Sequence, residues 1–443
     1  MKVIIYILFG LILFACSSKK AQLELVISDQ NALDSLILIA KNDGVVLKNS
    51  KKWVNAELIE NDKNRKVKVK QKGDMLDHIN DSFTSLHVKD ASNRYSLMLP
   101  HCRSYHQEYL IHKIFQDEGV LNTNYDFISV RFQGKDLFLA KESHFNQNLL
   151  KSQGRENGPI LRINEDRMWE KRKPKKKTLN YKWEENIPLS LTEKIKIYKN
   201  YEDSIVVTDA KQLLDDFRHG LITVSEAFDL ENVAKFWAIS NVFKADHGLV
   251  WSNMRFYYNP SSKKLEQIAY DCFGNRINEP NLLFRGSEKG HTNVEFHHLF
   301  LKDSTFLEHY EFYLKKYSSE EYLQKIQYQY QTEIKQIIAE IDPKNLLELN
   351  PDFYKSNAKL IRAFFENQSI SFQKDSLVLS SQKISDISKN DSLYKEHILH
   401  SKDENGYFYM SYFHLPIWIK HEQDSIELPS YQYYGYPEKI YTK

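Results

Sequence analysis

The chain has 443 residues, with 61 Lys and Arg against 59 Asp and Glu, which gives a formal net charge of +2 at pH 7. Hydrophobic residues make up 42% and charged residues 27%, a composition that excludes a disordered chain and indicates a folded protein with an ample core. The near balance of charge excludes a global electrostatic attraction to nucleic acid or to an acidic membrane.

The amino terminus resembles a secretion signal. A basic second residue is followed by an apolar run over 3–14 and then by Cys16. This pattern is typical of a signal peptide that ends in a lipobox, and the run is too short for a membrane span. We therefore expect a signal peptide over 1–15, a tether over 16–23 and a lipid on Cys16 that anchors a bacterial lipoprotein in the cell envelope, in the outer membrane. The alternative is an uncleaved signal anchor with a chance cysteine.

The next hundred residues are rich in predicted strands. Apolar and polar residues alternate with the two-residue period of half-buried strands, which predicts an antiparallel sheet with one solvated face from the runs 23–27, 53–59 and 66–70. Apolar residues at helical spacing over 105–115, before Gly119, predict a helix packed on that sheet. Two more strands are expected near 126–132 and 136–141.

A basic run spans residues 171–177 and contains Pro174. Proline and the lack of apolar periodicity favour a solvated loop between two lobes. The alternative is a clamp for an acidic substrate or for anionic headgroups near the lipid anchor.

With Cys16 lipidated, Cys102 and Cys272 are the remaining cysteines. A disulfide between them is compatible with an oxidising compartment, but two buried thiols are the simpler interpretation. No spacing of Cys and His in the sequence indicates a structural zinc site.

Helices dominate the second half. Asp229 can cap an apolar helix over 230–243 that leads directly to Asp246. A buried helix at this place would hold the Asp246 carboxylate in a defined position. Its aromatic residues are expected in the core.

The carboxyl-terminal part begins with a long helix. A capping pattern predicts its start at 318–321, and Pro343 ends it near residue 341. A helix near 351–365 and β-like runs at 376–380 and 407–420 follow. We expect these last elements to form a small appended unit.

The most informative motif lies between these regions. Asp246 and Asn253 share one loop, and Asp271 follows an apolar run and precedes Cys-Phe-Gly. Two β-rich runs, 254–259 and 264–270, predict a hairpin that brings Asn253 and Asp271 together. Phosphoryl transfer requires a carboxylate near the attacking hydroxyl and hard oxygen ligands for Mg²⁺, which these residues can supply. Spacing alone favours Asx turns in ordinary loops, because Asp and Asn are common there.

The order of these segments resembles the CotH kinase family, atypical protein kinases named after a spore-coat protein. The resemblance covers roughly residues 65–340 and is carried by the segments 69–78, 118–142 and 229–275. It implies an α+β, kinase-like, two-lobed fold. Its parts are an antiparallel β-rich lobe over 24–150, a mainly helical lobe over 151–345 and a C-terminal extension over 346–443.

The resemblance also implies an activity, the transfer of the ATP γ-phosphoryl group to a Ser or Thr hydroxyl of an unknown protein acceptor, with Mg²⁺ or Mn²⁺. Asp246 matches the family's catalytic aspartate, Asn253 its loop amide and Asp271 its metal-binding aspartate. Lys72 holds the basic position of the Lys-Gly motif, where it could contact phosphate. Glu142 matches a glutamate after an apolar strand, and its role, pairing with a lysine or contacting adenine, is open.

The chain departs from the family's pattern in two places. His87 stands where an arginine is expected, and a neutral imidazole is expected to bind phosphate more weakly than a guanidinium. Lys89 is retained as a nucleotide-binding candidate. Arg103 stands three residues after Pro100, where the family has an arginine closer to the proline. A pseudokinase or nucleotide-binding scaffold that recruits envelope partners is therefore the alternative. Transfer of a nucleotidyl group, or of phosphate to a glycan, is a third reading.

Overall fold

The computed structural model describes residues 23–44, 46, 48–91, 93–165, 194–198, 201–274, 294–366, 370–373, 376–380, 398–403, 405–411, 417–421, 424–428 and 440–441. Within these ranges, no helix has the length and apolar character needed to cross a membrane. The signal peptide over 1–15, the lipid-bearing Cys16 and the basic run over 171–177 lie outside the described residues. Those three expectations therefore stay predictions.

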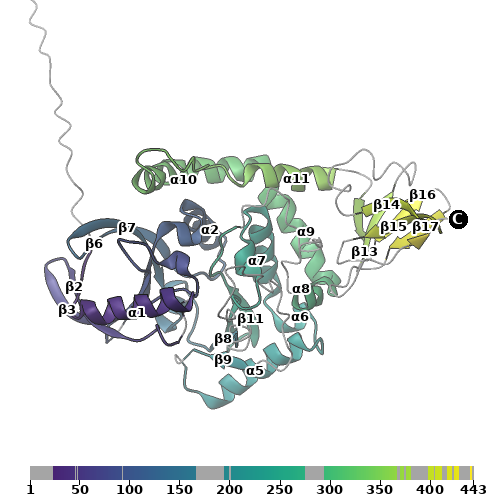
Figure 1. Cartoon of the computed structure of the whole chain (residues 1–443). Coiled ribbons are helices and arrows are strands. Elements are labelled where there is room, and N and C mark those ends of the chain that lie inside the picture. Colours follow the sequence, from purple (N-terminus) through teal and green to yellow (C-terminus); the bar gives the residue numbers. More distant parts are fainter. Residues whose placement is uncertain are drawn as a thin grey trace, which may run out of the picture.

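The amino-terminal part of the chain is a closed barrel of seven strands in the order β1-β2-β3-β4-β5-β7-β6, seen on the left of Figure 1. The strands are β1 (Leu23–Ile27), β2 (Val54–Glu60), β3 (Lys63–Gln71), β4 (Leu86–Lys89), β5 (Arg94–Met98), β6 (Tyr125–Phe132) and β7 (Lys135–Ser143). The five strands expected from periodicity are present. The sheet closes because β1 pairs with β6, in parallel, as well as with β2. Periodicity predicted an antiparallel sheet with one solvated face, and the closed barrel with its parallel β1–β6 pair corrects that expectation.

Alternation along the strands fills the barrel. Leu25, Leu58 and Val69 have no exposed surface and belong to one apolar core. Helix α1 (Gln30–Asp43), which the sequence analysis did not anticipate, is capped by Asp29 and adds Leu33 to that core. Two short 3₁₀ helices, η1 (Leu76–His78) and η2 (Pro100–Arg103), follow β3 and β5.

A second, mainly helical part lies beside the barrel, with α2 between the two (Figure 1). Its sheet has the order β11-β10-β8-β9. The elements are α2 (His106–Asp117), α3 (Gln147–Ser152), β8 (Ile160–Ile163), β9 (Ile195–Ile197), α5 (Ser204–Arg218), α6 (Val224–Ala227), α7 (Leu230–Val242), η3 (Asp246–Leu249), β10 (Arg255–Asn259), β11 (Lys264–Ile268), α8 (Val294–Leu301), α9 (Ser304–Ser318), α10 (Glu320–Ile341) and α11 (Lys355–Glu366). A mixed α+β fold, β-rich first and helical later, is therefore confirmed.

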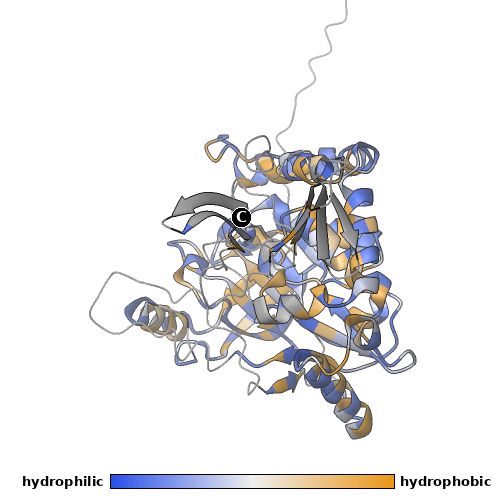
Figure 2. Cartoon of the chain, turned by 90° about the vertical axis from the view of Figure 1, so that its right-hand side faces the viewer, coloured by the Kyte–Doolittle hydropathy of each residue, from blue (hydrophilic) through white to orange (hydrophobic). Residues whose placement is uncertain are grey.

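Helix α7 forms the centre of this second part. Asp229 accepts a hydrogen bond from the Asn232 backbone N–H, which is the predicted cap. The helix is buried on nearly all sides because α2, α9 and β11 surround it. Peripheral helices instead carry hydrophilic and hydrophobic residues side by side, as Figure 2 shows, which is expected when one face is buried. Since α7 runs directly into η3, its packing fixes the start of the loop at Asp246.

The carboxyl-terminal elements form two small sheets, β12-β13-β16-β17 and β14-β15-β18. Their strands are β12 (Ile370–Gln373), β13 (Ser376–Ser380), β14 (Ile398–Asp403), β15 (Gly406–Ser411), β16 (Ile417–His421), β17 (Asp424–Leu428) and β18 (Ile440–Tyr441). The predicted strand at 376–380 is β13. The predicted run at 407–420 divides into β15 and β16.

Burial of His106 makes stability depend on pH. Its Nε2 donates to the Asn350 carbonyl oxygen at 2.9 Å, and burial lowers the pKa of His106 to about 4. Between pH 6.5 and 4 the unfolded chain takes up a proton that the folded chain does not, so acidification destabilises the fold. Lowering the pH from 7 to 5 should cost about 2 kcal/mol through this group.

Denaturant unfolding at both pH values measures this effect. His106→Gln should show a pH-dependent loss smaller than the parent's by about 2 kcal/mol. His219→Gln, at an exposed position, is the matched control and should behave like the parent. Equal pH dependence in all three proteins would contradict the assignment.

Candidate functional site

A buried ion pair lies where the barrel meets the helical part. Lys72 follows β3 and Glu142 lies on β7. Both residues are buried, with 5% and 1% of their surface exposed. Lys72 Nζ donates to Glu142 Oε2 at 2.9 Å and to the Tyr270 hydroxyl at 3.1 Å. The geometry thus answers the question left open by the sequence, because Glu142 pairs with a lysine.

Arg103, at the end of η2, extends this pair into a network of charges. Its guanidinium lies 2.5 Å from Asp271 Oδ1, 3.3 Å from Glu108 Oε1 and 3.9 Å from Glu142 Oε1. Arg103 is 3% exposed, and Glu108, on α2, is fully buried. Residues on or next to five elements, β3, η2, α2, β7 and β11, therefore converge on one charged cluster.

Electrostatic effects keep these groups ionised. Burial by itself lowers the pKa of Lys72, but the Glu142 carboxylate outweighs it and holds that pKa above its usual range. Burial raises the pKa of Asp271, but Arg103 and His247 outweigh it and hold the pKa well below its usual range. The pKa of Glu142 is likewise lowered by Lys72 and Arg103 against the effect of burial. The site is thus an alternation of fixed charges at neutral pH.

The loops of Asp271 and η3 are held together at close range. The His247 backbone N–H donates to the Phe273 carbonyl oxygen at 3.1 Å. A Cβ on Gly274 would lie 2.1 Å from the Lys244 carbonyl oxygen, and one on Gly248 would lie 2.6 Å from Cys272 Sγ. Glycine at both positions is what permits this approach.

His247 connects the two predicted metal ligands. Its Nδ1 lies 3.2 Å from Asp271 Oδ1, and Asn253 Nδ2 donates to the His247 carbonyl oxygen at 2.9 Å. The predicted hairpin is β10 and β11, in antiparallel register. It brings Asn253 Nδ2 and Asp271 Oδ1 to the same atom, His247 Nδ1, at 3.0 and 3.2 Å, which agrees with the expectation that the hairpin brings the two residues together.

The oxygen atoms at this point suit Mg²⁺. Arg103 and His247 both contact Asp271 Oδ1, so Oδ2 is the oxygen left to bind a cation. The amide nitrogen of Asn253 is held by His247, which leaves the amide oxygen for the same purpose. A carboxylate and an amide oxygen are ligands that Mg²⁺ prefers. Asp246 opens η3 beside them, but its side chain lies outside the described part of the structure.

Two rows that contain basic residues lie on the outer face of the barrel next to the ion pair. Directly opposed residues in antiparallel strands share a face, and the register joins Lys70 to His87, His87 to Ser96, and Ser96 to Glu142. Two residues along, a second row consists of Lys68, Lys89 and Arg94. The two rows carry one acidic group between them.

The cations in these rows repel one another. Burial and the neighbouring cations Arg94 and Lys51 lower the pKa of Lys70 to about 8. Burial followed by Lys72 lowers the pKa of His87 well below its usual range, so His87 is neutral and is not one of the cations. Lys70 and Arg94 both lie over the ring of Trp53, at 5.0 and 5.5 Å from its centroid. An electropositive surface of this kind favours a polyanion.

The structure thus separates the predicted residues into two places. Lys72, Glu142 and Asp271 meet in the charge network, and Asn253 lies one histidine away. Lys89 does not join them, because it is exposed and four residues along the strand ladder, roughly 13 Å, from Lys72.

Sequence reasoning missed four residues that shape the site, namely Glu108, His247, Tyr270 and Arg94. His247 and Tyr270 are direct neighbours of predicted site residues, which is a usable signal. No sequence signal marked Glu108 as a site residue, because a glutamate on a helix is ordinarily exposed. Both free cysteines of the described part, Cys102 and Cys272, are buried, which agrees with the simpler of the two expectations.

No protein-family model and no curated protein match this chain.

Mutation of the ion pair tests its energetic role. Lys72→Met or Glu142→Gln leaves a buried charge with fewer partners, so each should lower the free energy of unfolding by about 3–5 kcal/mol. The double variant should lose less than the sum, by about 1–3 kcal/mol, since the second change removes the orphaned charge.

Chemical denaturation of the four proteins gives the coupling energy. The exposed pair of Arg131 and Asp136, with an Nε to Oδ1 distance of 2.8 Å, is the matched control and should couple far more weakly. Strictly additive losses at Lys72 and Glu142 would contradict a pair that acts as a unit.

Proposed function

We propose that this protein is an envelope-anchored, CotH-like protein kinase that moves the γ-phosphoryl group of ATP to a Ser or Thr hydroxyl of a protein acceptor. The observation that carries the proposal is the buried network in which Lys72 pairs with Glu142 and Arg103 pairs with Asp271. Keeping four ionised groups in the interior costs free energy, which is expected where charge serves chemistry.

The network contains the residue types that kinases use. Protein kinases require a Lys and Glu ion pair together with an aspartate that binds Mg²⁺. Here Glu142 lies on strand β7, whereas kinases place that glutamate on a helix. Helix α2 supplies a different glutamate, Glu108, which lies 3.3 Å from Arg103. The kinase fold that we propose is therefore atypical.

Each residue has a distinct part in the proposed reaction. The acceptor hydroxyl oxygen attacks the γ phosphorus, the bond from that phosphorus to the bridging oxygen breaks, and ADP leaves. Asp246 takes the hydroxyl proton, and Lys72, held by Glu142, contacts the phosphates. Asp271 and Asn253 would hold Mg²⁺ or Mn²⁺, which supplies positive charge against the β and γ phosphates.

The cationic rows compensate for the missing arginine at position 87. Lys70 lies directly opposite His87 in the strand register, and Arg94 lies on the same face. Arg94 is also oriented by Trp53, so it is a preorganised donor for phosphate. Binding a triphosphate there would relieve the repulsion among these cations.

A second function has one observation in its favour. Arg103 lies 2.5 Å from Asp271 Oδ1, so it balances the charge of this carboxylate without a metal. Such a site suits a pseudokinase, a nucleotide-binding scaffold that recruits partners in the envelope. Metal dependence of nucleotide binding separates the two functions.

Thermal unfolding with ATP and Mg²⁺ or Mn²⁺ is the first test. Ligand at about a hundred times its dissociation constant should stabilise the fold by roughly 2.7 kcal/mol. Asp271→Ala should lose the metal-dependent part of this shift. Asp246→Ala should keep the shift and lose phosphoryl transfer.

Asp209→Ala, at an exposed site on α5, is the matched control and should retain both properties. Transfer at equal rates in the parent, Asp246→Ala and Asp271→Ala would refute the kinase assignment. A shift without any transfer in the parent would favour the scaffold.

Nucleotide binding should also depend on pH through Lys70. Its pKa is lowered to about 8, so it loses its proton as the pH rises through 8, and a bound polyanion would favour the protonated form. Affinity for ATP should therefore fall by up to about tenfold between pH 7 and 9.

Titration calorimetry in two buffers of different ionisation enthalpy measures the accompanying proton uptake. Lys70→Gln should remove most of the uptake while still binding nucleotide more weakly. Uptake that is the same in this variant as in the parent would exclude Lys70 as its source.

A further inference from the structure

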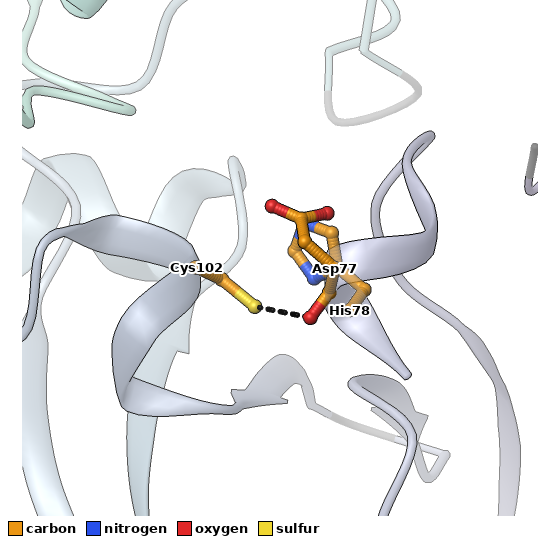
Figure 3. A group of neighbouring side chains, drawn as sticks. All are labelled: Asp77, His78 and Cys102. Carbon is orange, nitrogen blue, oxygen red and sulfur yellow. Dashed lines mark hydrogen bonds between the residues drawn. The ribbon is translucent and has the colours of Figure 1, made fainter. Parts of the chain in front are cut away.

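A second cluster of chemically reactive side chains lies next to the charge network. Asp77 and His78 are on η1, and Cys102 is on η2. A carboxylate oxygen, an imidazole nitrogen and the Sγ of these residues lie within 4.8 Å of one another. Figure 3 shows the Asp77 carboxylate in front of the His78 ring, with Cys102 reaching toward them from the facing element. The proposed phosphoryl transfer uses none of the three.

His78 is an incompletely satisfied buried group. It is 8% exposed, and its Nδ1 makes no hydrogen bond within the described part of the chain. An imidazole nitrogen buried without a partner costs free energy, so it marks a place where a ligand is expected.

The backbone is shaped to seat this ring. Gly73 has φ of +87°, and a Cβ there would lie 2.0 Å from a ring carbon of His78. No other residue would fit at position 73 without displacing the imidazole. Gly73 directly follows Lys72, so the ring is packed against the turn that carries the lysine of the ion pair.

The other two members of the cluster differ in exposure, because Cys102 is buried and Asp77 is exposed. Cys102 is 5% exposed, and its thiol donates a weak hydrogen bond to the Asp77 carbonyl oxygen at 3.5 Å. His101 Nε2 donates to the same oxygen at 2.7 Å. The Asp77 side chain is exposed, so its carboxylate can move toward the buried donors without disturbing the core.

We propose that Asp77, His78 and Cys102 form a binding site for Zn²⁺. Thiolate, imidazole and carboxylate are the ligands of zinc, and three protein ligands with a fourth position for water is a common arrangement. Ligands at tetrahedral angles, about 2.0–2.3 Å from zinc, lie roughly 3.5 Å apart. The cluster would therefore contract by about 1 Å, and the exposed Asp77 side chain is the one with room to move. Mg²⁺ disfavours this sulfur and nitrogen set.

Binding would exchange one proton and fix two turns. The thiol proton of Cys102 passes to solvent as the zinc–sulfur bond forms, and no electrons are transferred. The metal then joins η1, which begins three residues after Gly73, to η2, which ends at Arg103. Zinc would thus stabilise the turns that position both cations of the charge network, whatever reaction that network serves.

Metal titration of the full chain tests the site. Cys16→Ser in every protein leaves two thiols. Co²⁺ should bind with one equivalent and produce the near-ultraviolet absorption of a cobalt–thiolate bond, and Zn²⁺ should displace it. Cys102→Ser should abolish the absorption, and Asp77→Asn should weaken binding at least about tenfold. Asp77 is exposed, so this variant should fold normally.

The second buried thiol supplies the matched control. Cys272→Ala should retain the absorption and the affinity of the parent. Absorption that is lost in Cys272→Ala but kept in Cys102→Ser would overturn the proposal, as would an affinity unchanged by Asp77→Asn. Absence of any stoichiometric cobalt or zinc binding by the parent would overturn it as well.

Discussion

The need to pair buried charges constrains the rest of this structure. Removing an ion from water costs several kcal/mol, and an isolated partner inside the protein would be far less favourable than a complete set. Lys72 and Arg103 therefore depend on Glu142 and Asp271, and each of these four residues comes from a different element. The barrel, η2 and the loop after β11 must meet correctly for all four charges to be paired.

Packing of the helical part brings the remaining groups to that point. The buried helix α7 leads into η3 and fixes its position. Gly248 and Gly274 let the loop of His247 come into contact with the loop of Asp271. His247 then links Asp271 to Asn253. Fold by itself does not decide activity. The proposed activity depends on the oxygens of Asp271 and Asn253 and on the basic residues beside them.

Two adjacent sites share parts of the same backbone. Gly73 separates Lys72 from the turn that carries His78, and η2 supplies Cys102 to one cluster and Arg103 to the other. A cation bound by Asp77, His78 and Cys102 would restrict the motion of both turns. This coupling is a mechanical consequence of short connections, because two residues adjacent in sequence cannot move independently.

Local sequence by itself determined many of the elements of this protein, although not helix α1 or the barrel strands β4 and β5. Alternating residues defined five barrel strands, Asp229 marked the start of α7, and a two-strand pattern indicated the hairpin that brings Asn253 toward Asp271. These features depend on neighbours a few residues apart. Tertiary structure alone decided the closure of the barrel by β1 and β6, the partner of Glu142, and the meeting of His78 with Cys102. Lys72 and Glu142 are separated by 70 residues, and no local pattern encodes which strands pair or in what register.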